Sequence, residues 1–272
     1  MKPAYAWQFD PDHLEHVPVD LPAAITPEWA WGGSTGAGVK VAIVDSGVDP
    51  DHPWVGPIAD GVAVEYDPEL AARVRYDEGP HEDLYGHGTA CAAIVRSTAR
   101  DAQIYSIRVL GSRLSGKGFV FAAGLQWAID HGAQVVNLSL STPNRSHFAA
   151  FHRLVDEAVH RRIMVVSAMN NWPGRSYPSE FSGVFSVAAH EGTDPYVFDV
   201  NPNPPAEWGA PGIDLEVASL GGSTIRATGN SFASPHIAGL IAKILAKHPG
   251  LTVFQMKVVL QALARNADAV SA

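Results

Sequence analysis

Short runs of apolar and β-branched residues recur along this chain, and most are followed by a longer segment with helical periodicity. An uninterrupted apolar run of roughly four to eight residues is typical of a strand that is buried on both faces of a parallel sheet. The predicted strands cover residues 39–44, 104–110, 135–140, 163–167 and 184–188.

Segments with a helical spacing of apolar residues lie between these strands and after the last one. Strands that alternate with helices indicate an α/β fold of three layers, in which helices cover both faces of a mostly parallel central sheet. The predicted helices cover residues 90–95, 119–131, 147–161, 231–247 and 253–265.

The first part of the chain differs from the rest. Residues 1–35 are rich in proline, aspartate and tryptophan and show no clean periodicity. We expect them to form an extended arm that packs on a single domain spanning residues 36–272. A chain of 272 residues, of which 46% are hydrophobic, is long enough to bury the core of one such domain.

Composition argues against several classes of protein. The net charge of -9 disfavours a phosphate-binding surface, so nucleic acid is not an expected partner. No segment approaches the roughly 18 uninterrupted apolar residues of a membrane span, and the first residues do not resemble a signal peptide. Cys91 is the single cysteine, which fits a reducing compartment. We therefore expect a monomeric cytoplasmic protein without a membrane partner, and secretion stays open.

Four polar residues occupy positions where an α/β sheet places its active site. Asp45 and Asn171 each follow a predicted strand, and His87 and Ser231 each open a predicted helix. Sites in parallel sheets gather at the carboxyl ends of the strands, so these side chains are expected at one rim. Acyl transfer by serine needs a hydroxyl, an imidazole, a carboxylate and a donor to the oxyanion. The four residues supply one group of each kind.

Three segments resemble the motifs of subtilisin-like serine proteases. Residues 41–48, with the Asp-His-Pro of residues 51–53, resemble the aspartate motif, residues 86–92 the histidine motif, and residues 229–239 the serine motif. The order Asp, His, Ser is also that of subtilisin. The resemblance implies a serine endopeptidase that acts on peptides or proteins, with the subtilisin-like α/β/α fold.

The same resemblance implies a role for each residue. Ser231 would attack the scissile carbonyl, His87 would take the serine proton, and Asp45 would orient the imidazole. Residues 165–171 resemble the family segment Val-Val-Ala-Ala-Ala-Gly-Asn, which makes Asn171 the side-chain donor to the oxyanion. Asn170 then replaces a customary glycine, and asparagine tolerates left-handed dihedrals. A register in which Asn170 is the donor, or a structural turn made by both residues, stays open.

Further residues resemble the substrate-binding parts of the family. Two segments would pair with a peptide as an added strand, although ordinary strand ends are the alternative. Of another two residues, the first follows the oxyanion asparagine and the second lies near the expected floor of the specificity pocket. Serine and threonine stand where the family has two glycines after leucine, so the primary specificity is open. The residues concerned are Leu110, Gly111 and Ser112, then Ser139, Leu140 and Ser141, and finally Trp172 and Ser176.

Two features near His87 have alternative interpretations. Cys91 lies one helical turn after His87, and we expect a small buried hydrophobic side chain rather than a nucleophile. Four carboxylates, Asp77, Glu78, Glu82 and Asp83, precede the histidine motif. They form either a solvated acidic loop or a surface that favours basic substrate residues.

A cofactor and a metal are not expected. Many subtilisins hold calcium beside the connection that follows the histidine helix, but here residues 96–103 are short and carry a single carboxylate. The resemblance thus implies no calcium requirement at this connection. The arm of 35 residues is too short for the usual prodomain, which indicates a minimal processing protease.

Two other functions are compatible with parts of the sequence. The first is a non-catalytic subtilisin-like domain that only binds peptides, which the intact triad residues disfavour. The second is a dinucleotide-binding oxidoreductase, because glycines at positions 36 and 38 lie near a strand. Those glycines precede the strand, whereas a phosphate-binding loop follows one.

Overall fold

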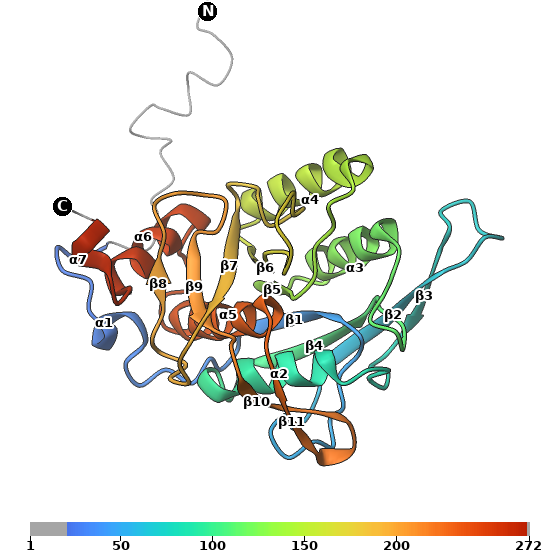
Figure 1. Ribbon diagram of the computed structural model, residues 1–272, viewed down its shortest axis with the longest axis horizontal. Coiled ribbons are helices and arrows are strands. Elements are labelled where there is room, and N and C mark those ends of the chain that lie inside the picture. Colours follow the sequence, from blue (N-terminus) through green and yellow to red (C-terminus); the bar gives the residue numbers. More distant parts are fainter. Residues whose placement is uncertain (1–20, 271–272) are drawn as a thin grey trace, which may run out of the picture.

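The computed structural model describes residues 21–270 and is built around a sheet of nine strands in the order β3-β2-β4-β1-β5-β6-β7-β9-β8 (Figure 1). Neighbouring strands are parallel except for the pairs β2–β3 and β8–β9 at the two edges. The strands are β1 (Lys40–Asp45), β2 (Asp60–Tyr66), β3 (Val74–Glu78), β4 (Gln103–Arg108), β5 (Val135–Leu138), β6 (Met164–Ala168), β7 (Val184–His190), β8 (Asp199–Val200) and β9 (Trp208–Pro211).

Helices cover both faces of this sheet. In Figure 1, α3 and α4 lie on one side of the sheet, and α2 and α5 lie on the other. The helices are α1 (Pro27–Trp31), α2 (His87–Thr98), α3 (Gly118–Asp130), α4 (Phe148–His160), α5 (Asn230–Lys247), α6 (Val253–Leu263) and α7 (Ala267–Val270), and β10 (Leu215–Ala218) pairs with β11 (Thr224–Ala227) in a separate hairpin. The predicted three-layer α/β/α architecture is confirmed.

Strand β1 shows why the apolar runs fold in this way. Val41 and Ile43 pack into the cluster formed with α2 and α5, whereas Ala42 and Val44 pack into the cluster formed with α3 and α4. Successive side chains of a strand point to opposite faces, so a strand between two helical layers needs apolar residues at every position. All four side chains are buried accordingly.

The edge strands were not predicted from the pattern. In β3 only Val74 is buried, and the remaining residues are exposed, so the segment has the composition of a polar loop. Its strand conformation comes from antiparallel pairing with β2, in which Val74 lies opposite Tyr66. Pairing between segments, rather than local preference, therefore determines this edge.

The described part of the predicted arm is not wholly extended. Residues 27–31 form α1, and Thr26 caps it by accepting a hydrogen bond from the Trp29 N–H group. The Trp29 ring stacks on His248 at 4.1 Å, and Ser34 Oγ donates to the Lys243 carbonyl at 2.7 Å. These contacts fasten the segment to the carboxyl end of α5. Residues 1–20 of the predicted arm lie outside the described residues.

Over residues 21–270, none of the helices combines the length and the apolar character needed to cross a membrane.

Candidate active site

Asp45 and His87 form a buried hydrogen-bonded pair at the carboxyl end of β1. His87 Nδ1 lies 2.8 Å from Asp45 Oδ1 and 2.9 Å from Oδ2, and the Ser46 N–H group donates to Oδ1 at 2.8 Å. An ionised carboxylate only accepts hydrogen bonds, so Nδ1 carries the proton in this contact. The other ring nitrogen, Nε2, is then left as an acceptor in the neutral imidazole.

The charge of Asp45 changes the acidity of His87. Burial by itself lowers the pKa of this imidazole, because it disfavours the cation. The Asp45 carboxylate and the Cys91 thiol act in the opposite direction, and the pKa of His87 ends well above 6.5. The geometry therefore favours an imidazole that binds a proton readily.

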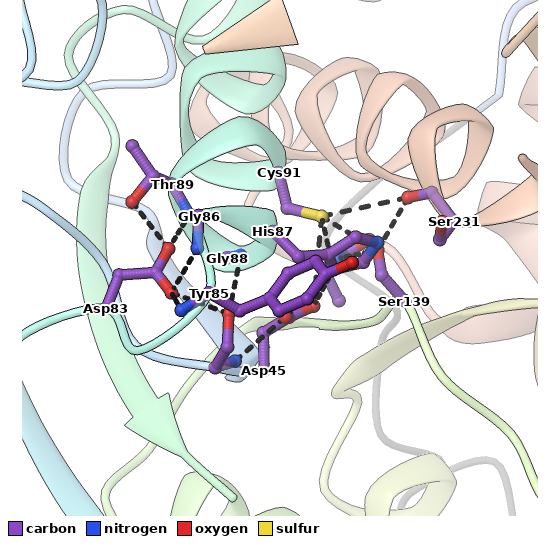
Figure 2. Close-up of polar contacts among 12 residues, drawn as sticks. Asp45, Asp83, Tyr85, Gly86, His87, Gly88, Thr89, Cys91, Ser139 and Ser231 are labelled. Atoms are coloured by element: carbon purple, nitrogen blue, oxygen red, sulfur yellow. Dashed lines mark hydrogen bonds and ion pairs between the residues drawn. The ribbon is translucent and has the colours of Figure 1, made fainter. Parts of the chain in front are cut away.

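Asp83 caps the helix that carries His87. The residue before α2 is Gly86, which has no side chain to offer the free N–H groups of the first turn. The Asp83 carboxylate takes this role. It accepts hydrogen bonds from the N–H groups of Tyr85, Gly86 and Thr89 and from the hydroxyls of Ser46 and Thr89 (Figure 2).

The position of Asp83 corrects one interpretation of the acidic run. Asp83 is buried, and its carboxylate already accepts hydrogen bonds from these five donors. It therefore lies neither in a solvated loop nor on a surface that could bind basic substrate residues. In Figure 2, Asp83 and Ser231 lie on opposite sides of His87. Asp77, Glu78 and Glu82, by contrast, are exposed.

Two glycines allow β1 and α2 to approach this closely. A Cβ atom on Gly88 would lie 2.0 Å from the Gly47 carbonyl oxygen, and one on Gly47 would lie 2.3 Å from the Glu82 carbonyl oxygen. Gly47 also has a φ of 108°, which side chains rarely permit. Glycine is thus required at both positions to bring His87 onto Asp45.

Ser231 lies in the first turn of α5, and a proline four residues later shapes its surroundings. Pro235 has no N–H group, so the Ser231 carbonyl lacks its usual partner within the helix. Ser139 Oγ fills this gap by donating to the Ser231 carbonyl at 2.8 Å. Ser139 in turn accepts a hydrogen bond from Asn137 Nδ2 at 2.8 Å. The predicted nucleophile is therefore held from the end of β5 as well as by its own helix.

Cys91 lies inside this group of residues. Its side chain is fully buried, and Sγ lies 3.1 Å from Ser139 Oγ, 3.8 Å from Asp45 Oδ2 and 3.9 Å from His87 Nδ1. Burial raises the pKa of the thiol, which favours the protonated form. The expectation of a small buried side chain agrees with this position.

A metal ion at this place would compete with the Asp45–His87 pair. Ligand atoms of Asp45, His87 and Cys91 lie within 4.8 Å of one another, the one such group found among the described residues. A soft ion would need the thiolate and a deprotonated ring nitrogen. Because Nδ1 donates its proton to Asp45, binding would break that hydrogen bond. The arrangement is better suited to proton transfer than to holding a metal.

Asn171 is oriented so that its amide group can donate into the site. The Asn230 N–H group donates to Asn171 Oδ1 at 2.9 Å, which leaves Nδ2 free to face elsewhere. A Cβ atom on Gly229 would lie 3.2 Å from Ser231 Oγ and 3.6 Å from Asn171 Nδ2. The hydroxyl and the amide therefore converge on the same small region.

Asn170 has a different environment from its neighbour. Its Oδ1 accepts from Ser141 Oγ at 2.8 Å, and its Nδ2 donates to the Arg175 carbonyl at 2.7 Å. Among the described residues, those with positive φ do not include Asn170. The tolerance of asparagine for left-handed backbone therefore does not explain why this residue is asparagine. The two hydrogen bonds of its side chain do explain it.

These groups open onto a cavity of about 350 Å³. His87, Asn171 and Ser231 line it together with residues 114–116 and residues 139–142. Of the predicted substrate-binding residues, those on the cavity are Leu110, Ser139, Leu140 and Ser141.

The other predicted substrate-binding residues lie elsewhere. Gly111 lines a neighbouring cavity of about 490 Å³, and Ser112, Trp172 and Ser176 line neither. Trp172 is 81% exposed. Ser176 is fully buried, where its Oγ accepts from the Asn170 N–H group at 3.0 Å, so it supports the loop instead of forming a pocket floor.

Residues 114–116 were not predicted to line the site, because they have no periodicity and precede a helix, as an ordinary loop does. The small residues Ser115 and Gly116 were the feature of the sequence that could have indicated a backbone wall. A Cβ atom on Gly116 would lie 2.7 Å from the Val109 carbonyl oxygen, so the backbone itself forms the wall here.

Comparison with known proteins gives a consistent result. The family model described as "Subtilase family" matches residues 36–271. Subtilisin E of Bacillus subtilis (strain 168) is 30% identical over 274 residues, covering 93% of this chain and 68% of that protein. Subtilisin of Bacillus pumilus is 30% identical over 266 residues, 92% of each chain. The solved structure "S41 Psychrophilic Protease" has a TM-score of 0.69 at 24% identity. The match covers 83% of this chain and 82% of the chain in that structure, so the two share the fold.

Proposed function

This chain belongs to the subtilase family of serine proteases, and we propose that it is an endopeptidase whose nucleophile is Ser231. The observation that carries this proposal is the buried Asp45–His87 pair, whose imidazole faces the same cavity as Ser231 and Asn171. An imidazole with one nitrogen held by a carboxylate can use its other nitrogen to take the proton of a serine hydroxyl in the same cavity.

The chemistry follows from this geometry. Ser231 Oγ attacks the scissile carbonyl carbon, and His87 Nε2 takes the hydroxyl proton. Asp45 remains ionised and stabilises the imidazolium. His87 then returns the proton to the leaving amine, the C–N bond breaks, and the acyl group stays on Ser231 Oγ as an ester. The same imidazole then takes a proton from a water molecule that attacks the ester carbon. The C–O bond to Ser231 breaks, the imidazolium returns the proton to Ser231 Oγ, and the carboxylic acid product leaves.

Negative charge develops on the carbonyl oxygen during both attacks. Asn171 Nδ2 and the Ser231 N–H group would receive it, since the N–H groups of Asn230 and Phe232 already donate to Asn171 Oδ1 and to the Gly229 carbonyl. Donors fixed in advance need no reorganisation when the charge appears, which makes them effective in the transition state.

The cavity walls offer a way to hold an extended peptide. Within residues 21–270, the backbone N–H and C=O groups of Gly116 and Leu140 make no hydrogen bond to other backbone groups. A substrate strand inserted between them would satisfy these groups on both of its edges, as in peptide binding by strand addition. We infer that a protein substrate binds as an extended segment.

A fluorophosphonate probe tests the proposal directly, since it reacts with an activated serine. Wild-type protein should be labelled on Ser231 and should cleave an unstructured protein substrate. Ser231→Ala should lose labelling and lose turnover by about a millionfold, while unfolding at the same temperature as wild type.

The rival function, a peptide-binding domain without catalysis, makes the opposite prediction. It would bind peptides without labelling and without cleavage in either protein. Substantial cleavage by a clean Ser231→Ala preparation would show that the nucleophile is another residue.

A further inference from the structure

Residues 139–142 and residues 168–171 both line the cavity that contains Asn171, and we call these two segments its walls. A hydrogen bond joins the walls, because Ser141 Oγ donates to Asn170 Oδ1 at 2.8 Å. Both residues line the cavity. The bond therefore occupies space between the walls that a substrate side chain would otherwise use.

The position of the nucleophile decides which substrate residue meets this bond. During attack, the scissile carbonyl carbon must lie beside Ser231 Oγ, and its oxygen beside Asn171 Nδ2. The side chain of the residue that owns this carbonyl branches from the adjacent Cα atom. Since Asn170 directly precedes Asn171, the space between the two walls is the part of the cavity that this side chain reaches.

Other hydrogen bonds keep the walls from moving apart. Thr142 and Tyr177 exchange two backbone hydrogen bonds of 2.9 Å each, which tie the first wall to the loop after the second. The Asn170 side chain also donates to the Arg175 carbonyl, and its N–H group donates to the buried Ser176 Oγ. Widening the gap would break several of these bonds together.

We propose that Ser141 and Asn170 restrict this protease to substrates with a small side chain, such as that of glycine, alanine or serine, on the residue that supplies the scissile carbonyl. The inference rests on the proposed role of Ser231. A larger side chain has to displace the Ser141 hydroxyl, which leaves Asn170 Oδ1 without its donor, and has to fit between walls that are tied together. In a close-fitting pocket, a single methylene group changes kcat/KM by about 10- to 200-fold.

A series of peptide p-nitroanilides that differ only in the residue before the scissile bond tests this inference. With alanine, valine, leucine and phenylalanine at that position, wild-type kcat/KM should fall from alanine to phenylalanine by at least about tenfold. The double variant Ser141→Gly/Asn170→Gly removes both side chains. It should raise the rate for leucine and phenylalanine by about tenfold or more relative to alanine.

Matched variants separate the hydrogen bond from other effects. Ser141→Gly alone removes the side chain from one wall and leaves the contacts of Asn170 with Arg175 and Ser176 in place. It should therefore give part of the rise in the relative rate for leucine and phenylalanine without affecting folding. Ser146→Gly makes the same substitution at an exposed serine outside the cavity and should retain the wild-type profile. Titration of Ser231 with a fluorophosphonate gives the concentration of active enzyme in each preparation.

Two results would overturn the inference. One is a labelled wild-type enzyme that cleaves the phenylalanine and alanine peptides equally well. The other is a labelled, folded double variant with an unchanged profile. Failure of the proposed function looks different, because neither labelling of Ser231 nor cleavage of any peptide would then be observed.

Discussion

Asn170 and Asn171 are neighbours in the chain, but their side chains have different partners. The side-chain oxygen of Asn171, Oδ1, accepts a hydrogen bond from the Asn230 N–H group, so its side-chain nitrogen, Nδ2, is free to donate beside Ser231. The Asn170 amide is already committed to Ser141 and Arg175. The two residues should therefore respond differently to the same substitution.

Asn171→Leu should lower kcat by about a hundredfold to a thousandfold with little change in KM, because a donor to the oxyanion acts mainly in the transition state. Steady-state kinetics with an alanine-containing peptide measures both parameters. Asn170→Leu is the control and should act mainly on the choice of substrate. A large fall in kcat for Asn170→Leu but not for Asn171→Leu would show that the register is shifted by one residue.

The pH dependence of catalysis also depends on two residues, His87 and Asp45. His87 accepts a proton only in its neutral form, and the carboxylate of Asp45 raises the pKa of His87 well above 6.5. A raised pKa means that the neutral base is reached only at higher pH. Hence kcat/KM should rise with pH along a limb whose midpoint lies above 6.5.

Asp45→Asn provides the comparison for this pH profile. It removes the charge that stabilises the imidazolium, so the midpoint should move to lower pH while kcat falls by about ten-thousandfold. A wild-type limb at or below pH 6.5, or a limb that does not move in the variant, would contradict the conclusion that Asp45 raises the pKa of His87 against the effect of burial.

At the scale of elements, the start of α2 depends on Asp83. Glycine precedes the helix, and the Asp83 carboxylate binds the N–H group of Thr89 in its first turn and those of Tyr85 and Gly86 just before it. The same carboxylate binds Ser46, the residue after Asp45, so it holds the end of β1 against the start of α2. His87 is the first residue of that helix, and its position relative to Asp45 follows from this contact.

Asp83→Asn should destabilise the protein, because one carboxylate oxygen becomes an NH₂ group that faces other donors. A lost hydrogen bond to a buried charge costs about 1.5–3 kcal/mol, which corresponds to a fall in Tm of roughly 3–12 °C. Glu82→Gln makes the same change of charge at the exposed neighbour and should leave Tm unchanged. Equal thermal unfolding of the two variants would contradict the capping role of Asp83.

At the scale of the whole molecule, Arg96 connects segments that lie far apart in the chain. Its guanidinium donates to the carbonyls of Val55 and Pro57 at 2.9 Å each, and to those of Arg100 and Ala102 beyond the end of α2. Four carbonyl oxygens around one cation resemble part of a calcium site, but the cation here is a side chain. This contact supports the proposal that the connection over residues 96–103 needs no calcium.

Calcium and a chelator should accordingly give the same Tm and the same peptidase rate. Arg96→Met should lower Tm by roughly 3–8 °C, because it removes the donor of four carbonyl groups, of which those of Val55 and Ala102 are partly buried. Arg100→Met, at an arginine that is 76% exposed on the same connection, should have little effect. A rise of several degrees with millimolar calcium, abolished by changes in residues 96–103, would contradict the proposal.

The sequence by itself determined the parallel core and the residues on which the proposed chemistry rests. An apolar run such as residues 39–44 buries both of its faces only inside a sheet covered by helices, so local pattern was sufficient for the central strands. The pattern located Asp45 at the end of a strand and Ser231 at the start of a helix, and the resemblance to the motifs of subtilisin-like proteases implied their roles.

Tertiary structure alone decided the function of Asp83, the wall formed by residues 114–116 and the bond between Ser141 and Asn170. Asp83 and Ser46 are 37 residues apart, and Ser141 and Asn170 are 29 apart. Periodicity reports which face of an element is buried, and it carries no information about which distant side chain lies opposite. A carboxylate that caps a helix and a carboxylate in a solvated loop therefore have the same appearance in a sequence, and only packing distinguishes them.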